Sequence, residues 1–321
     1  AYGDSLAHTP NIDALAAGGF LFSNAFAPVP VCGAARAAML SGRKPTTNRF
    51  LSYDSRLDED LPEAPSLPGH FKAHGYHTLA NGKVFDVSND SADSWSEPLW
   101  NPEGRWASSV VRATRHEDLQ KAYLELSGEG PGPAIERLEV DDDAYPDGEV
   151  AEKTVSDLNR LREHGSPFFL AVGFRKPHLP FTAPEKYWQL YDPAEIDLPS
   201  TYREPPEGAP VRAVHNSPEL RRQYSGIAAR GLLDDALASE LIHGYRAAVS
   251  YADAQVGKVL YALEANGLAD NTIVVLVGDH GWNLGEHTLW TKHSLFDVTL
   301  RTPMIVRAPG HKGGRIDGVA D

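Results

Sequence analysis

The stretch from residue 240 to residue 277 reads ELIHGYRAAVSYADAQVGKVLYALEANGLADNTIVVLV, and its pattern decides which class of fold we predict. Between residues 240 and 266, apolar side chains recur every three or four positions, which is the spacing of one face of a helix. They are Leu241, Tyr245, Ala248, Ala252, Val256, Val259 and Leu263. Residues 272–277 are almost wholly apolar, which is typical of a buried strand. A long helix followed at once by a buried strand is therefore expected.

The same order of helix and apolar strand occurs elsewhere in the chain. Residues 149–163 place apolar side chains at helical spacing, and the apolar run 168–174 follows. A helical pattern from residue 11 leads into a short strand at 20–22, and a helix over 67–74, closed by Gly75, leads into a strand at 76–79. This alternation predicts an α/β sandwich with a central, mostly parallel mixed sheet flanked by helices. Without repeats or a linker, residues 1–321 are expected to form a single domain.

Composition limits the kinds of function. The chain has 321 residues, of which 41% are hydrophobic and 23% charged, as in globular proteins. Its net charge of -14 argues against a nucleic acid or an anionic membrane as a partner. No apolar run approaches the roughly 20 residues that span a bilayer. The segment 86–148 is polar, with Trp95, Trp100 and Trp106 as expected anchors, and predicts a long surface excursion.

Cys32 is the only cysteine, which excludes an internal disulfide. It lies where a proline-containing loop gives way to good helix formers at 34–40, hence at or just before a helix N-terminus. The partial positive charge there stabilises a thiolate or a bound anion, and Arg36 adds a cation one turn on. Alternatively, Cys32 is a small buried apolar side chain, as most single cysteines are. The stretch itself is compatible with both interpretations.

Two of the apolar strands end in dense polar clusters, and ligands of open α/β sheets bind beyond the carboxyl ends of strands. After 168–174 the chain reads RKPHLP, and after 272–277 it reads GDHGW. Asp279 and His280 form a candidate metal pair, or alternatively a turn cap and a packed imidazole. His178 is a candidate acid or base and Lys83 a candidate cation, or both are ordinary surface groups. Together with Cys32, these residues supply a nucleophile, a cation, a metal pair and a proton donor. These are the groups needed to attack a tetrahedral oxyanion.

Several motifs, in order, resemble those of the type I, formylglycine-dependent sulfatases. They begin with TPNIDAL at 9–15, CGAAR at 32–36, which matches the signature C-x-[P/A]-x-R, and GYHT with GK between 75 and 83. PFFLAVGFRKPHLPF at 167–181, SYADAQVG at 250–257, and DHGW, LGEH and WTK between 279 and 292 resemble the iduronate-2-sulfatase-like branch in particular. The resemblance covers nearly the whole chain apart from 86–148 and 192–237.

The resemblance implies an alkaline-phosphatase-like fold and hydrolysis of sulfate esters, with a sulfated saccharide as the expected substrate. Cys32 is then the precursor of Cα-formylglycine, made by a formylglycine-generating enzyme, and the derived hydroxyl attacks sulfur. By position, Arg36 steadies the formylglycine, whereas Lys83 and Lys292 contact sulfate oxygens. His178 protonates the leaving oxygen.

The resemblance also assigns binding groups. His287 is expected to bind substrate, and one Ca²⁺ is expected to be held by Asp279, His280 and the position of Cys32. Relatives of this kind are commonly exported, so a periplasmic, extracellular or lysosomal location is expected.

Three departures from the family pattern bear on these expectations. The family's first metal ligands are consecutive aspartates at the end of an N-terminal strand that would lie just upstream of Ala1. Either such a strand precedes Ala1, or the site lacks half of its calcium ligands. Asp86 follows the Gly-Lys of the second signature where the family has a histidine, so Asp86 or His77 is a candidate replacement. The smaller C-terminal subdomain is expected to be mostly missing, because the chain stops at Asp321.

Two other functions are compatible with the sequence. A phosphate or phosphonate monoester hydrolase uses the same formylglycine site, and a non-catalytic sulfoglycan-binding relative keeps the pocket without turnover. The ratio of rates on aryl sulfate and aryl phosphate distinguishes the first of these from a sulfatase, and the mass of the Cys32 peptide tests the second.

Overall fold

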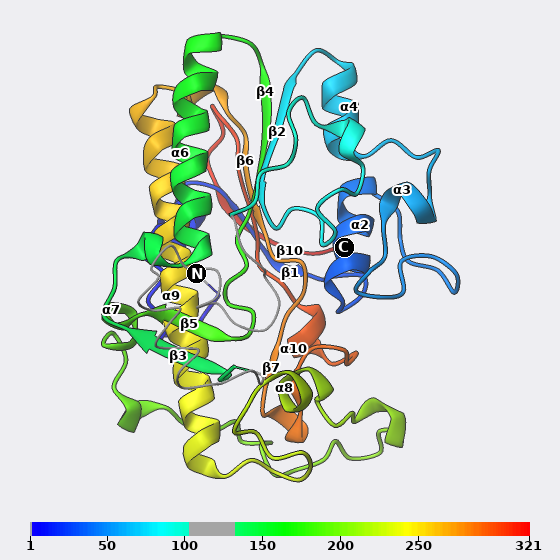
Figure 1. Ribbon diagram of the computed structural model, residues 1–321, viewed down its shortest axis with the longest axis vertical. Helices are drawn as coiled ribbons and strands as arrows, with labels where there is room; N and C mark the ends of the chain where they lie inside the picture. Colours follow the sequence, from blue (N-terminus) through cyan, green and yellow to red (C-terminus); the bar gives the residue numbers. More distant parts are fainter. Residues whose placement is uncertain (1, 103–131) are drawn as a thin grey trace.

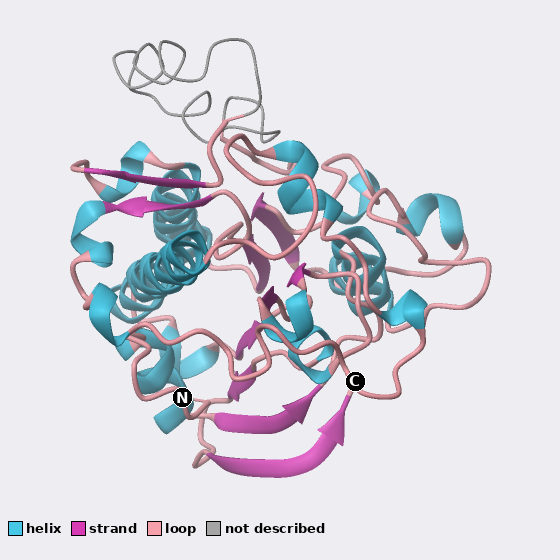
Figure 2. Cartoon of the chain, turned by 90° about the horizontal axis from the view of Figure 1, so that it is seen from below, coloured by secondary structure: helices cyan, strands magenta, loops and turns pink. Residues whose placement is uncertain are grey.

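The fold has three layers, with strands between two groups of helices (Figure 1). The computed structural model describes residues 2–102 and 132–321. On one side of the strands run α6 (Pro146–His164) and α9 (Asp235–Ala265), and on the other lie α2 (Cys32–Ser41), α3 (Leu57–Asp60) and α4 (Leu67–Ala73). Figure 2 shows the strands between the helical layers from below. The predicted α/β class is confirmed.

Four strands form the larger sheet, in the order β10-β1-β9-β6. These strands are β10 (Gly314–Ala320), β1 (Phe20–Ala25), β9 (Met304–Arg307) and β6 (Val274–Val277). Only β9 runs against the others, because β1 is parallel to β10 and β9 is antiparallel to both β1 and β6. A second sheet pairs β2 (His77–Gly82) in parallel with β4 (Phe168–Gly173). The sheet is mixed, as predicted, but it is divided in two.

Smaller elements complete the described chain. Two further strand pairs are β3 (Ile135–Leu138) with β5 (Phe181–Pro184) and β7 (Asn283–Leu284) with β8 (Trp290–Thr291). The shorter helices are α1 (Pro10–Ala17), α7 (Glu185–Trp188), α8 (Pro218–Gln223) and α10 (Asp297–Leu300). Single 3-10 turns are η1 (Ala92–Ser94), η3 (Asp142–Ala144), η4 (Pro193–Glu195), η5 (Val211–Ala213), η6 (Ala269–Asn271) and η7 (Glu286–Thr288).

The ends of the two long helices follow from their capping residues. α9 begins after Asp234, whose carboxylate accepts the backbone N–H of Leu237 at 3.0 Å. α6 begins at Pro146, whose fixed φ and missing N–H suit a first turn, and it ends before Gly165 in the left-handed conformation. The helices predicted over 149–163 and 240–266 are confirmed, and each begins earlier than its apolar pattern because the cap lies upstream.

The strands predicted at 168–174 and 272–277 are present, but the prediction that they are buried is wrong. Val275 and Val277 are 56% and 40% exposed, and β4 is mostly half-buried. Val274 of β6 packs with Phe168 and Leu170 of β4 on the apolar cluster that α6 and α9 also contact. Among the described residues, β6 pairs only with β9 and β4 only with β2. Each strand therefore has an edge without a neighbour, and exposure depends on that neighbour rather than on the strand's own sequence.

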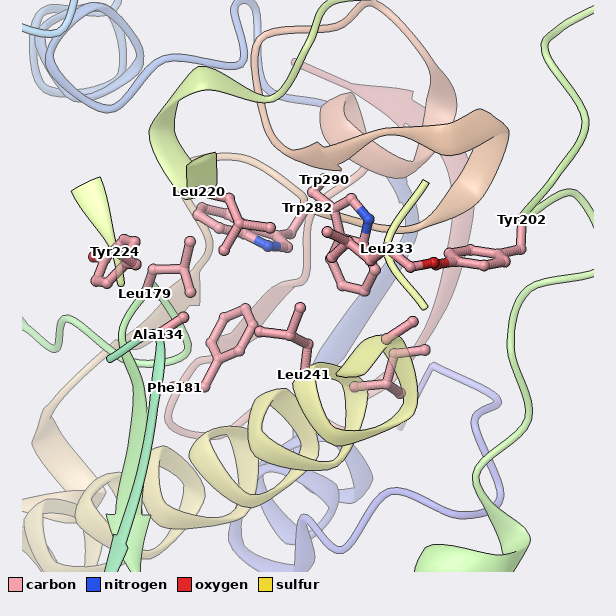
Figure 3. Packing of buried hydrophobic residues seen from close by; sticks show 12 residues of the cluster. Ala134, Leu179, Phe181, Tyr202, Leu220, Tyr224, Leu233, Leu241, Trp282 and Trp290 are labelled. Carbon is pink, nitrogen blue, oxygen red and sulfur yellow. The ribbon is translucent and has the colours of Figure 1, made fainter. Parts of the chain in front are cut away.

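An apolar cluster fixes the loops beyond the strand ends (Figure 3). Trp282, Trp290 and Leu220 point toward one another, and Phe181 and Leu241 lie beside them. Trp282 and Trp290 belong to the segment after β6, and Leu220 belongs to α8. The cluster therefore anchors two segments that also carry polar residues of the candidate site.

Two expectations about the surface can be compared with the structure. Trp95 is buried in a cluster with residues of α2, as expected of an anchor, whereas Trp106 and the rest of 103–131 lie outside the described residues. None of the helices within 2–102 and 132–321 combines the length and apolar character needed to cross a membrane.

Candidate active site

Cys32 is the first residue of α2, so its predicted place at a helix N-terminus is confirmed, and it is also buried. Its Sγ lies 3.1 Å from Nε2 of His280. The other ring nitrogen of His280 lies 2.8 Å from the carbonyl oxygen of Gly281, to which it donates. Nε2 is therefore the nitrogen that faces the sulfur.

Arg36 ties the carboxylate after β6 to the turn after β2. Its Nε donates to Oδ2 of Asp279 at 2.8 Å, and its Nη1 donates to the carbonyl oxygens of Lys83 and Val84, the latter at 3.0 Å. A guanidinium has five N–H donors in a rigid plane, so it can hold several acceptors in fixed relative positions. Arg36 therefore sets the position of Asp279 relative to Lys83.

Lys83 is placed by a close approach of two glycines. Gly82 and Gly173 face each other at the ends of the parallel strands β2 and β4, and the backbone N–H of Lys83 donates to the carbonyl oxygen of Gly173 at 2.7 Å. A Cβ on Gly82 would lie 2.3 Å from that oxygen, and Gly82 has a φ of +75°. Only glycine fits there without strain. The side chain of Lys83 reaches Asp86, with Nζ 2.8 Å from Oδ1.

His178 and Lys292 come together around a carboxylate from α8. Lys292 Nζ lies 2.6 Å from Nε2 of His178 and 2.8 Å from Oε1 of Glu219. The same Oε1 lies 2.9 Å from Nε2 of His178. Nδ1 of His178 donates to the carbonyl oxygen of Leu179 at 2.8 Å, so the imidazole is held at both nitrogens.

Two buried charged residues hold the loop that carries His178 in place through hydrogen bonds to its backbone. The carboxylate of Asp147 accepts the backbone N–H groups of Arg175 and Lys176 at 2.8–3.0 Å. Lys176 Nζ in turn donates to the carbonyl oxygen of Pro180 at 2.6 Å. Burial lowers the pKa of Lys176 to about 8, although the charge of Asp147 acts in the opposite direction. The backbone around His178 is thus fixed before any substrate arrives.

Electrostatics at the centre favour anions. Burial alone would raise the pKa of the Cys32 thiol, but the charges of Lys292 and Lys83 and hydrogen bonds with His178 and His280 hold it well below its usual range. Burial also acts to raise the pKa of Asp279, and Arg36 and His280 more than offset it, so the pKa lies far below normal. Burial acts to lower the pKa of His280, whereas the charge of Asp279 acts to raise it, and the net result is a raised pKa. Cys32 is thus both buried and disposed to ionise.

The same balance operates at Glu219. Burial acts to raise the pKa of its carboxyl, but hydrogen bonds with His178 and His293 and the charges of His178 and Lys292 hold it far below its usual range. Glu219 is therefore ionised.

A family model, that of the sulfatases, matches residues 1–320. The chain belongs to the sulfatase family. Its members use formylglycine and a divalent metal. This sulfatase chain is 36% identical over 320 residues to iduronate 2-sulfatase of Homo sapiens, which covers 96% of the chain and 57% of the relative. It is 29% identical over 330 residues to a sulfatase of Formosa agariphila, and this match covers 96% of the chain and 61% of the relative. The chain thus spans between half and two thirds of these relatives' length.

Solved structures agree on the fold. One is the structure of a protein in complex with its substrate, D-glucosamine-2-N,6-O-disulfate. It has a TM-score of 0.71 and 20% identity, and the match covers 99% of this sulfatase chain and 70% of that chain. Another is a phosphonate monoester hydrolase of Agrobacterium radiobacter, with a TM-score of 0.69 and 23% identity, covering 98% and 66%. At such identities the likeness establishes the alkaline-phosphatase-like fold alone, and this part of the prediction is confirmed.

The three expected metal ligands of the sulfatase chain do lie together. Cys32, Asp279 and His280 offer ligand atoms that are all within 4.8 Å of one another. A carboxylate and an imidazole suit a divalent cation, and the set therefore fits a metal. Calcium prefers six to eight oxygen ligands, and among the described residues this group supplies oxygens only from Asp279. The set therefore lacks most of the oxygen ligands that calcium prefers.

The other expected site residues divide into two groups. Cys32, Arg36, Lys83, His178, Lys292, Asp279 and His280 are linked by the contacts above. Nδ1 of His287 bonds to the carbonyl oxygen of Glu204 at 3.0 Å, and its ring lies 5.4 Å from that of Phe296 at a tilt of 39°. Within the described chain, these contacts do not connect His287 to the other site residues. His77 pairs with Glu97 at 3.1 Å at the start of β2, about 17 Å along the strand from its end.

Two residues that contact His178 or its loop were not predicted from the sequence. Glu219 lies in the short helix α8, within the segment 192–237 that the family motifs do not cover. Asp147 lies in the first turn of α6 and resembles an ordinary acidic residue near a helix N-terminus. Only the fold brings either one to His178 or its loop.

Proposed function

We propose that this chain is the catalytic domain of a sulfate-ester hydrolase that acts on a sulfated saccharide. The observation that carries the proposal is the cluster at the N-terminus of α2, where Cys32 lies 3.1 Å from His280 and Arg36 holds Asp279 at 2.8 Å. The charges of Lys83 and Lys292 act on the same position. The sulfate group under attack spreads its charge over several oxygens, so several fixed cations stabilise it. Relatives named iduronate 2-sulfatase and ulvan-active sulfatase support a saccharide substrate.

Each residue has a proposed role. Formylglycine made from Cys32 by a formylglycine-generating enzyme supplies an oxygen nucleophile for sulfur. Lys83 and Lys292 bind sulfate oxygens, and His178 donates a proton to the leaving oxygen. Arg36 holds Asp279 and the Lys83 turn in place, which is the geometry found between these groups.

The site also suits a divalent cation, proposed to be Ca²⁺, which when bound would neutralise charge on the sulfate oxygens. Asp279 and His280 would hold it together with the residue at position 32. Conversion of Cys32 replaces sulfur with oxygen, which suits calcium better than the thiol does. His287 and Asp86 remain candidates for contact with the saccharide and for proton transfer, respectively.

A further strand beside β6 is part of this proposal. The edge of β6 away from β9 exposes Val275 and Val277 and faces the half-buried β4. The hydroxyl of Tyr2 contacts the backbone of Met304, which is the partner of Val277 at the end of β6. A strand upstream of Tyr2 that runs parallel to β6 would therefore end next to Asp279, where aspartates from it would add the missing oxygen ligands.

The test is release of inorganic sulfate. The full-length protein, coexpressed with a formylglycine-generating enzyme, is incubated with Ca²⁺ and a panel of sulfated oligosaccharides. Sulfate release from a panel member, faster than phosphate release from the matching phosphate ester, is the expected result. If the Cys32 peptide has lost about 18 Da, as conversion to the aldehyde requires, and no member releases sulfate, the proposal is overturned.

A further inference from the structure

Glu219 is the point at which two proposed catalytic side chains meet. One of its oxygens, Oε1, lies 2.8 Å from Nζ of Lys292 and 2.9 Å from Nε2 of His178. The three side chains are 12%, 3% and 22% exposed. His293 approaches the other oxygen, with Nε2 3.7 Å from Oε2. A single carboxylate oxygen thus sets the distance between an ammonium and an imidazole.

The position of Glu219 is itself fixed by its neighbours. Leu220, the next residue, is buried against Trp282 and Trp290 (Figure 3). On the other side, Ser217 accepts the backbone N–H of Trp290 through its hydroxyl at 2.8 Å. Since Trp290 lies two residues before Lys292, α8 is attached to the segment that carries Lys292 at two points.

A carboxylate at this position opposes the binding of an anionic substrate, so its presence requires an explanation. A sulfate ester is an anion, and a fixed carboxylate next to its binding cations repels it. Lys292 has a flexible four-carbon stem with three N–H donors, so its ammonium requires acceptors to keep one orientation. Glu219 provides such an acceptor, and Trp282 lies under the ammonium with its ring centre 4.8 Å from Nζ.

We propose that Glu219 is a positioning residue that orients His178 for proton donation to the leaving oxygen and holds Lys292 beside it. This inference rests on the proposed function and deepens it. When the sulfur–oxygen bond breaks, the bonding electron pair goes to the saccharide oxygen, and the proton on Nε2 of His178 is transferred to that oxygen. Before substrate binds, Glu219 accepts that N–H at 2.9 Å and so fixes the orientation of the ring, and the saccharide oxygen then replaces Glu219 as the acceptor of the proton.

The test compares substrates that differ in their need for a proton. An alkoxide leaving from a saccharide sulfate requires protonation, whereas 4-nitrophenolate leaves readily without it. E219A removes the carboxylate, E219Q keeps one oxygen acceptor for Lys292, and D142N is the matched control. Asp142 is also 12% exposed, and its carboxylate pairs with Lys186 at 2.8 Å and Lys258 at 2.9 Å rather than with His178 or Lys292.

We expect E219A to lower kcat on the saccharide sulfate by about 10- to 100-fold, which is typical of residues that orient a catalytic group. Loss on 4-nitrophenyl sulfate should stay below roughly threefold, because that reaction depends little on the acid. E219Q should fall between E219A and the wild type, and D142N should leave both kcat values unchanged. Equal losses on both substrates, or no loss on the saccharide, would overturn the inference.

Failure of the proposed function gives a different result. If the converted wild type hydrolyses neither ester, the proposed function fails, and crystal structures of the wild type and E219A then decide the role of Glu219. The expected difference is a displacement of about 1 Å or more of Lys292 Nζ or of the His178 ring, the scale at which catalysis is lost. Unchanged positions of both side chains would refute positioning by Glu219.

Discussion

Glu136 is predicted to make the stability of the fold depend on pH. Glu136 lies on β3 and is half-buried, and its Oε1 accepts the hydroxyl of buried Tyr145 at 2.9 Å. Burial raises the pKa of Glu136 from 4.5 to about 7, although Tyr145 and Lys176 act to lower it. Glu136 adjoins Lys176, which braces the loop of His178, so its charge bears on the site as well as on the fold.

The sign follows from proton binding. Between pH 4.5 and pH 7 the folded protein holds a proton on Glu136 that the unfolded chain has lost, so the free energy of unfolding falls as the pH rises through this window. At about 1.4 kcal/mol per pKa unit, the rise from 4.5 to about 7 corresponds to about 3 kcal/mol at full ionisation. E136Q keeps an oxygen acceptor for Tyr145 but carries no charge. It should match the wild type near pH 4.5 and exceed it by up to about 3 kcal/mol at pH 8.

The assay is urea unfolding of the wild type and E136Q at intervals between pH 4.5 and pH 8.5. Taking the difference between the two proteins removes the contribution of all other titrating groups. E139Q is the control, since Glu139 is an exposed carboxylate one residue beyond β3. A difference between E136Q and the wild type that stays constant over this range would refute the reasoning.

Three further predictions concern the site. G82A should lower the free energy of unfolding by at least about 2 kcal/mol in a denaturant titration, because the added Cβ meets Gly173 and φ is positive; unchanged stability would contradict the close approach. K83M should lower kcat/KM about 10²- to 10³-fold with little change in Tm, and a smaller loss would exclude Lys83 from sulfate binding. Calcium at 100 times its Kd should stabilise the wild type by about 2.7 kcal/mol but not D279N, and equal effects would place the ion elsewhere.

Local features of the site were predictable because they depend on neighbouring residues. The place of Cys32 at the start of α2 follows from the prolines before it and the helix formers after it, and it is confirmed. Asp279 and His280 follow an apolar run, which shows that a strand ends there. The family resemblance added roles that these patterns do not contain.

Long-range features were not predictable in this way. Glu219 reaches Lys292 across 73 residues, and nothing in its own segment indicates that contact. Val275 and Val277 are exposed on a strand that pairs only with β9 among the described residues, so their apolar character predicted burial wrongly. His287 was assigned to substrate binding by the resemblance alone, and the sequence did not indicate that its Nδ1 bonds to the carbonyl oxygen of Glu204, 83 residues away.

The most direct test of the central claim relates sulfate release to the state of residue 32. Preparations with different fractions of converted Cys32, measured by mass spectrometry of the peptide, are assayed on one sulfated oligosaccharide together with C32A. Specific activity should rise in proportion to the converted fraction and be absent from C32A. Activity that is independent of the converted fraction, or that persists in C32A, would contradict the assignment of Cys32 as the source of the nucleophile.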